Sequence, residues 1–141
     1  MSSKINDEII ASYHAAIYHF GTDPSAIELC IGQYSKPLSC LIAESGHRCA
    51  VFISAYNPGS RIQCSEFNRV AHDQLHNDLR SHADQIIEGV SSDPSVVWPP
   101  EMGFLAVGVD LATAQRLGDQ YGQNAILWAD EDAVPRLVLL R

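Results

Sequence analysis

An apolar run that ends abruptly at a turn constrains this chain more than any other feature of its sequence. Residues 49–53 are all apolar, and the seven residues that follow them are Ser54-Ala55-Tyr56-Asn57-Pro58-Gly59-Ser60. A helical pattern begins soon afterwards, at about Ser65. Where a strand ends in a turn that leads into a helix, the loop lies at the surface beside the carboxyl end of the strand. This is where α/β proteins hold ligands. The sequence therefore predicts that the functional surface lies at this turn.

The turn itself has the residues of a type II β-turn. Pro58 presets φ at the second position, and Gly59 supplies positive φ at the third, which follows Asn57 and Pro58. Ser60 could then cap the next helix, and Gln63 three residues later would complete a capping box. The sequence thus predicts a tight turn with a positive φ at Gly59.

This segment allows two interpretations. In the structural one it is a well-formed turn followed by a helix cap. In the functional one Asn57, Ser60, Arg61 and free backbone N–H groups form a polar cradle for an anionic group, to which Arg61 could donate two hydrogen bonds. Spacing alone leaves both interpretations open.

The hydrophobic pattern predicts one α+β domain over residues 1–141, with a single mixed, mostly antiparallel sheet and about three helices packed on it. The predicted helices cover residues 5–20, 65–82 and 110–121. The predicted strands cover residues 26–31, 39–44, 48–55, 86–90, 104–109, 125–129 and 136–140. Ser45-Gly46-His47 is expected to join the second and third strands as a hairpin turn. Phe67 and Val70 are expected on the buried stripe of the long helix, with Leu75 and Leu79.

Composition and charge exclude several classes of partner. The 141 residues include 17 acidic and 9 basic side chains, for a net charge of −8, which argues against nucleic-acid binding. The chain shows neither a signal-peptide pattern nor an apolar stretch long enough to cross a bilayer. Its four cysteines lack metal-binding spacing, so we expect them to be reduced and mostly buried in a cytoplasmic protein. The sequence leaves the oligomeric state open.

Four further polar residues could belong to a site. Asn68 falls within the predicted buried stripe of the long helix, where an unpaired amide would cost about 1–3 kcal/mol. It must therefore bond either to the nearby turn or to a ligand. Gln123 and Asn124 precede an apolar strand, and Glu101 follows Trp98-Pro99-Pro100. Glu101 is a candidate general acid or base, although a loop glutamate is more often simply solvated.

His72 and His76 are spaced for a zinc site on one helix face. The segment His72-Asp73-Gln74-Leu75-His76 is superficially similar to the His-Glu-x-x-His of metalloproteases. We expect the pair to flank the buried stripe on its outer side, and the sequence offers no obvious third ligand. We therefore expect no metal and no other cofactor.

Several of these segments together resemble a known family. They are Phe52 to Ser60, Asn68 with Ala71, Leu75 and Leu79, Trp98 to Glu101, 104–109 and Gly122-Gln123-Asn124-Ala125. They resemble short bacterial proteins grouped as domain-of-unknown-function family 3293, over residues 11–138. The resemblance implies a bacterial cytoplasmic protein whose signature residues meet at one site, and it implies no activity, substrate or cofactor. His72 and His76 are not part of its pattern.

We expect a site for a small polar ligand, such as a nucleotide, nucleoside or sugar phosphate. Amides would line it, because amides match the donors and acceptors of heterocycles and sugar hydroxyls. Its expected residues are Asn57, Asn68, Gln123 and Asn124, with Ser60 and Arg61 at the helix start. Glu101 could act as an acid or base, but no nucleophile pairs with a base, so catalysis stays open.

Two alternatives remain. In the first, the chain is a protein-interaction or regulatory module whose amides only brace loops and whose acidic surface contacts a basic partner. In the second, His72 and His76 serve a metal-dependent hydrolase. Convergence of the amides and Glu101 on an open cleft would favour the ligand site. Hydrogen bonds that close on one another without a cavity would favour the interaction module.

Overall fold

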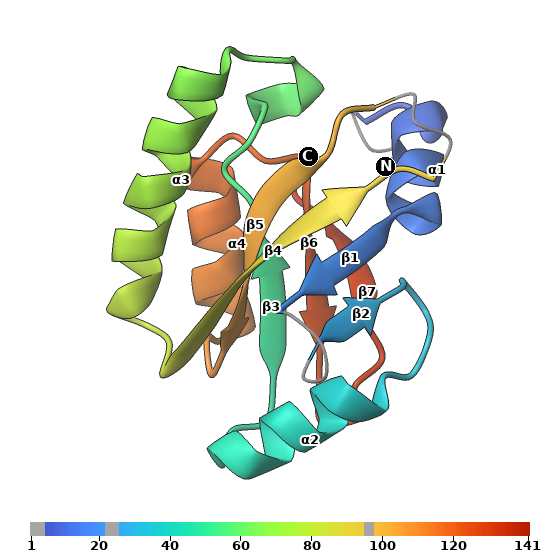
Figure 1. Ribbon diagram of the computed structural model, residues 1–141, viewed down its shortest axis with the longest axis vertical. Coiled ribbons are helices and arrows are strands. Elements are labelled where there is room, and N and C mark those ends of the chain that lie inside the picture. The colour runs from blue at the N-terminus through green and yellow to red at the C-terminus, as the bar shows by residue number, and fades with distance from the viewer. Residues whose placement is uncertain (1–4, 22–25, 95–97) are drawn as a thin grey trace.

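The computed structural model describes residues 5–21, 26–94 and 98–141, and in these ranges it contains one curled sheet with four α-helices (Figure 1). The helices are α1 (Asp7–Ala15), α2 (Lys36–Ser45), α3 (Ser65–Arg80) and α4 (Leu111–Gln120). The strands are β1 (Ile17–Phe20), β2 (Ile27–Leu29), β3 (Ala50–Ile53), β4 (Gln85–Ser92), β5 (Glu101–Val107), β6 (Ala125–Ala129) and β7 (Arg136–Leu139). A short 3-10 turn, Pro58–Ser60, follows β3.

The seven strands lie in the order β2-β1-β4-β5-β3-β6-β7, and every described pair is antiparallel. The predicted α+β class with a single sheet is confirmed. The sheet is antiparallel and not mixed, and the described helices number four, not about three.

Helices cover both faces of the sheet, which is why its inner strand β3 is apolar throughout. In β3, Val51 and Ile53 face α3 and α4, whereas Ala50 and Phe52 face the other side. Figure 1 shows α3 and α4 together on one face, with α1 on the opposite side and α2 at one end. An uninterrupted apolar strand is the expected pattern where both faces are buried.

The first predicted helix is too long. Asn6 caps α1 by accepting a hydrogen bond from the Ile9 amide at 2.9 Å, but the helix ends at Ala15. The chain then adopts an extended conformation as β1, from which the Tyr18 and Phe20 side chains point inward. Alternation over four residues is too short to be distinguished from helical spacing, so pairing with β2 and β4 decides the structure here.

The predicted strand over residues 39–44 is wrong, because this segment belongs to α2. Ser35 caps the helix through the Leu38 amide, Pro37 lies in its first turn, and Gly46 ends it at φ 75°. Gly46 is thus a helix C-cap and not the centre of a hairpin turn. Leu38 and Ile42 are buried against the sheet at helical spacing.

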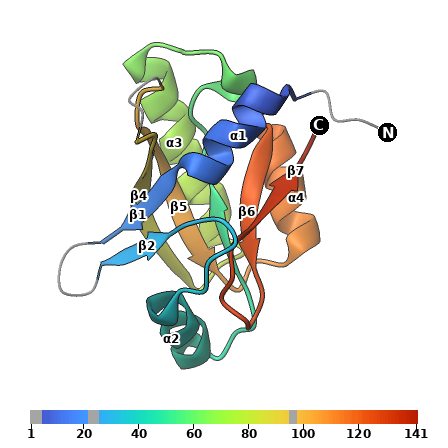
Figure 2. The ribbon, with the colours of Figure 1, turned by 90° about the vertical axis from the view of Figure 1, so that its right-hand side faces the viewer.

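The sheet curls so far that the loops next to its two edge strands meet (Figure 2). The Gly32 amide, just after β2, donates to the Pro135 carbonyl at 2.8 Å, and the Ser35 amide donates to the Ala133 carbonyl at 3.0 Å. Pro135 and Ala133 directly precede β7. The concave face is therefore closed around a core of buried side chains, among them Phe20, Leu29 and Phe52.

The burial of two α3 side chains and of the cysteines differs from expectation. Phe67 and Val70 of α3 are exposed, so the buried stripe of that helix is narrower than predicted. Of the four cysteines, Cys40 and Cys64 are exposed and the other two only partly buried, which contradicts the expected burial. Within the described ranges, no helix is long and apolar enough to cross a membrane.

Candidate functional site

Antiparallel register brings five strand ends and α1 to one end of the sheet. β3 pairs with β5 and β6 in opposite direction, so its carboxyl end lies beside the first residues of both. Ser91 near the end of β4 pairs with Glu101 at the start of β5, and Ile17 at the start of β1 pairs with Ser92. The turn after β3, the loop before β6 and the end of α1 therefore surround one location.

The turn after β3 is held from inside by Asn68. The Asn57 amide N–H donates to Asn68 Oδ1 at 3.0 Å, and Asn68 Nδ2 donates to Asn57 Oδ1 at 2.9 Å. Asn57 Oδ1 also accepts from the Gln63 amide at 2.9 Å. Asn57 adopts a left-handed conformation, φ 48°, and Gly59 has φ 65°, which confirms its predicted positive φ. Asn68 is thus a buried residue that holds the turn from behind, and it does not line the cavity that lies on the other side of the turn.

Ser60 does not cap the long helix. It also has a positive φ, 60°, and α3 begins five residues later, after Cys64, without a side-chain cap. Gln63 therefore completes no capping box. The Ser60 hydroxyl instead accepts a hydrogen bond from Asn124 Nδ2 at 2.8 Å. The predicted cap is wrong because the intervening residues, including exposed Arg61, run in extended conformation before the helix starts.

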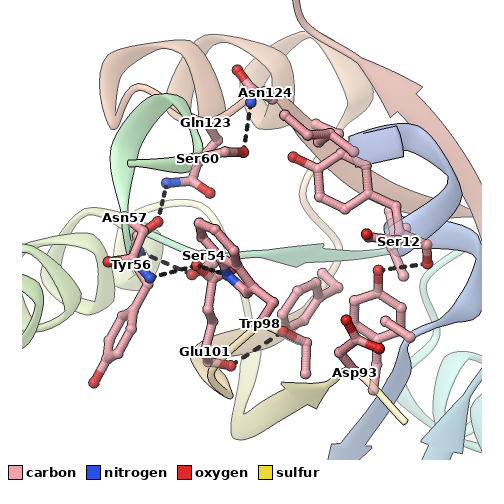
Figure 3. A pocket seen from close by; sticks show the side chains of 18 of the residues that line it. Ser12, Ser54, Tyr56, Asn57, Ser60, Asp93, Trp98, Glu101, Gln123 and Asn124 are labelled. Atoms are coloured by element: carbon pink, nitrogen blue, oxygen red, sulfur yellow. Dashed lines mark hydrogen bonds between the residues drawn. The ribbon is translucent and has the colours of Figure 1, made fainter. Parts of the chain in front are cut away.

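The predicted proximity of the turn to Gln123 and Asn124 is confirmed. Besides the Asn124–Ser60 bond, Gln123 Nε2 donates to the Tyr56 carbonyl at 3.0 Å, and the Gly59 amide donates to the Gly122 carbonyl at 2.8 Å. Figure 3 shows Asn124, Ser60, Gln123 and Asn57 along one side of the cavity. Three hydrogen bonds therefore join the two loops into one rim.

Glu101 is the first residue of β5 and faces this rim, whereas the sequence placed it in a loop. Its Oε2 accepts from Asn57 Nδ2 at 2.6 Å and from Trp98 Nε1 at 3.0 Å. Burial raises the pKa of the Glu101 carboxyl above its ordinary value, and these two hydrogen bonds oppose the change. Glu101 thus has the environment of a group that can hold a proton at a higher pH than an exposed glutamate.

A cavity of about 140 Å³ lies beneath the rim, between α1 and the concave face of the sheet. Its apolar lining includes Ile9 and Ala16 from the α1 segment and Phe52 and Leu127 from the sheet. Its polar lining includes Ser54, Asn57, Ser60, Glu101, Gln123 and Asn124. Figure 3 places Ser12 and Asp93 across the cavity from Asn57 and Ser60. The cavity is therefore apolar at its base and polar along one side.

Two tyrosines complete the cavity, and sequence analysis missed both. The pKa of the Tyr13 hydroxyl is raised by burial, and hydrogen bonding with the Ser60 and Asn124 side chains opposes the rise. The Tyr18 hydroxyl donates to the Tyr13 carbonyl at 3.1 Å, and burial also raises its pKa. No sequence signal links them to the rim, because the α1 segment reaches it only through sheet pairing.

The predicted residues thus divide into two groups. Asn57, Ser60, Gln123, Asn124 and Glu101 line one cavity. Arg61 and Asn68 do not line it, since Arg61 is exposed and Asn68 lies behind the turn. The N–H groups expected to be free at the turn are occupied, because those of Asn57, Gly59, Ser60 and Arg61 all donate to protein acceptors.

His72 and His76 lie elsewhere, on the α3 face of the sheet. His72 is buried and not on the outer side as expected, because its ring stacks on Phe104 with centroids 4.2 Å apart. Its Nε2 lies 2.9 Å from Glu88 Oε2, and Tyr56 contacts the ring edge-on. Across the described part of the chain, no group of three or more His, Cys, Asp or Glu side chains is placed to hold a metal ion.

The chain belongs to a family described as "Protein of unknown function (DUF3293)", whose model matches residues 53–126. The matched segment runs from the last residue of β3 into β6 and contains every predicted site residue, including Asn57, Asn68, Glu101 and Asn124. No curated protein and no solved structure shows a significant match to the chain.

Proposed function

We propose that this protein binds a small polar ligand, of the nucleoside, nucleotide or sugar-phosphate kind, in the cavity beneath the rim. One observation carries the proposal: Asn57, Gln123, Asn124 and Glu101, remote in sequence, line a single cavity of about 140 Å³. A pocket with an apolar base and a few convergent polar groups is the usual form of a small-molecule site. The mouth of a curled sheet is also a common place for one.

The main alternative, an interaction module with bracing amides, accounts for only part of the geometry. Asn57 and Asn68 do bond to each other, which is bracing. Yet the bracing hydrogen bonds leave a cavity beside them, and Asn124 and Gln123 contact it as well as the turn. Loops that needed only support would be expected to pack without a void, since protein interiors are close-packed.

Catalysis would fall to Glu101. Its raised pKa suits a general acid or base, and its carboxylate lies at the cavity. The hydroxyls of Ser54 and Ser60 line the cavity too, but Ser54 donates to the Met102 carbonyl at 2.6 Å and Ser60 has no basic partner in the described ranges. We therefore propose binding as the function and Glu101 as the group through which any reaction would proceed.

We also propose a cytoplasmic location. The supporting observation is that Cys30, Cys40, Cys49 and Cys64 are all free thiols, two of them exposed. Exposed free thiols are typical of a reducing compartment.

Thermal unfolding with a ligand panel tests the proposed function. The panel contains nucleobases, nucleosides, nucleotides, sugars and sugar phosphates. Ser12→Trp places a bulky side chain at the cavity from an exposed position of α1, and Ala11→Trp, also exposed on α1 but outside the lining, is its matched control. A ligand at 100 times its Kd should stabilise the protein by about 2.7 kcal/mol.

We expect at least one class to raise the melting temperature of the wild type and of Ala11→Trp, but not of Ser12→Trp. Stabilisation that persists in Ser12→Trp would place the ligand outside the cavity. A panel in which nothing stabilises the wild type would contradict the proposal.

A further inference from the structure

We propose that the group held in the cavity is a single small ring carrying a hydrogen-bond-donating, preferably cationic, nitrogen that pairs with Glu101, and that anionic groups such as phosphate are excluded. The inference rests on the proposed binding of a small polar ligand in this cavity, and of the ligand kinds named there it retains only those without phosphate, such as the base of a nucleoside. Three independent features of the cavity carry it: its unused hydrogen-bonding atoms, its charges and its aromatic walls.

The unused atoms are acceptors. Glu101 Oε2 receives two N–H groups, but Oε1 has no hydrogen bond within the described ranges. Gln123 Nε2 donates to the Tyr56 and Tyr121 carbonyls. Gln123 Oε1 likewise has no hydrogen bond within the described ranges. Neither oxygen is sealed from solvent, because the one fully enclosed unpartnered side-chain atom of the described residues is His72 Nδ1. A ligand that donates hydrogen bonds would satisfy both oxygens.

The charges exclude an anion. Among the described residues that line the cavity, none is Lys or Arg, while Glu101 supplies a carboxylate. Arg61, which the sequence suggested as a phosphate partner, is exposed and outside the lining. The net charge of −8 on the whole chain adds to the repulsion of anionic ligands. A phosphate here would meet like charge in a partly buried setting, where such repulsion is strongest.

The walls suit a ring and a cation. Tyr13, Tyr18, Phe52 and Trp98 all line the cavity, and Tyr18 packs edge-on against Phe52 with centroids 5.0 Å apart. Aromatic faces attract cationic nitrogen groups. The volume of about 140 Å³ is close to that of a cavity, about 150 Å³, that accepts benzene. A single ring therefore fills the cavity.

The Glu101 carboxylate is held in place before any ligand arrives. Asn57 and Trp98 bind its Oε2 from two sides, which fixes the direction of Oε1. Burial raises the pKa of this carboxyl, and a cationic partner would offset that burial. A pre-positioned acceptor loses little conformational freedom on binding, which favours affinity.

Three probes with one ring and different head groups test the inference: benzylamine, benzyl alcohol and benzoate. Binding can be followed by the indole N–H resonances of the protein at neutral pH, because the chain has two tryptophans. Trp98 Nε1 binds Glu101 at the cavity, whereas Trp128 Nε1 binds Asp130 and serves as an internal reference. We expect benzylamine to shift the Trp98 signal with at least tenfold higher affinity than benzyl alcohol, and benzoate to have no effect.

Glu101→Gln should abolish the advantage of benzylamine over benzyl alcohol, whereas Glu44→Gln, an exposed residue of α2 with the same charge change, should retain it. Should Glu101→Gln fail to fold, wild-type titrations supply the same test. The benzylamine advantage should fall as the pH drops towards 4.5, the ordinary pKa of a glutamate, because the pKa of Glu101 is raised and its carboxyl becomes neutral before that pH is reached.

The outcomes separate the two proposals. Benzoate binding as tightly as benzylamine, or an advantage that survives Glu101→Gln, would overturn the inference and leave a ring-binding cavity in place. Failure of all three probes to move the Trp98 signal would also overturn it, and the nucleoside and sugar panel on Ser12→Trp would then decide the proposed function by itself.

Discussion

Helices cover both faces of the sheet, but they pack on the two faces in different ways. On one face, α4 buries Ala114 and Leu117 in a continuous core, and α3 adds Leu75 and Leu79. On the other face, α1 has nine residues and buries none of them. Its inward side chains, including Ile9 and Tyr13, line the cavity and do not fill the core.

This difference separates stability from binding within one small fold. A helix that packs on a filled core gains its hydrophobic free energy whether or not a ligand is present. A helix that covers a cavity gains less, and an occupant of the cavity would add the missing contacts. The core under α3 and α4 should therefore stabilise the protein with or without ligand, as should the filled core that α2 covers on the other face. Only the part of that other face under α1 should respond to ligand.

The largest effect should come from comparing Leu75→Ala with Ile9→Ala. Leu75 is fully buried on the inner face of α3, so its truncation should lower the free energy of unfolding by about 2–5 kcal/mol. Ile9 is half-buried at the cavity, and its truncation should cost less than about 1 kcal/mol. Urea unfolding of both variants measures the difference. Equal losses would show that α1 is as much a part of the core as α3.

A second test concerns the brace behind the rim. Asn68→Leu keeps a similar volume but leaves the Asn57 amide and Oδ1 without their partner, so stability should fall by about 1–3 kcal/mol. Asn77→Leu, at an exposed position of the same helix, is the control and should be close to neutral. An Asn68→Leu variant as stable as the wild type would mean that the turn does not depend on α3.

The turn itself provides a smaller effect. A Cβ on Gly59 would meet nothing within 4 Å, so the cost of Gly59→Ala comes from its φ of 65° and should be about 1 kcal/mol. Gly59→Asn should cost less, because asparagine tolerates the left-handed region. Chemical denaturation of the two variants gives the comparison. An alanine variant that matches or exceeds the wild type would contradict the observed turn conformation.

The smallest effect is the pH dependence contributed by Glu101. Burial raises its pKa in the folded state above 4.5, so the folded protein binds the proton more tightly than the unfolded chain. This stabilising contribution is therefore complete at pH values below 4.5 and is lost as the pH rises through the higher folded-state pKa. Glu101→Gln should remove this dependence and Glu44→Gln should retain it, as measured by denaturation from pH 4 to 8. If the stabilities of Glu101→Gln and the wild type changed with pH in the same way, the pKa of Glu101 would not be raised by folding.

Sequence reasoning located much of the rim but little of the cavity. Asn57, Gln123 and Asn124 follow or precede strong apolar strands, so the strand ends could be found from hydrophobic pattern and turn residues. That they meet follows from antiparallel pairing of β3 with β6, which the sequence permitted without specifying. Tyr13 and Tyr18 could not be assigned, because the curl of the sheet brings α1 over the same strand ends.

The misassigned segment α2 carries sequence signals for both a strand and a helix. Its short apolar run fits a strand by composition, and a hairpin turn at Gly46 completed that interpretation. Ser35, Pro37 and Gly46 nevertheless occupy the positions of a helix N-cap, first turn and C-cap. Giving capping residues more weight than a short apolar run would have corrected the error from sequence alone.

The contacts between the loops at the two sheet edges also determine when this protein can acquire its site during synthesis. Leu137 of β7 lines the cavity, and the Pro135 carbonyl receives the Gly32 amide across more than a hundred residues of chain. β3 must likewise wait for β5 and β6, which the ribosome adds later. Pairing of this kind is slow because a long loop must close first. A nascent chain can thus form the α3–β4 region early, while the cavity is completed only after β7 has left the ribosome.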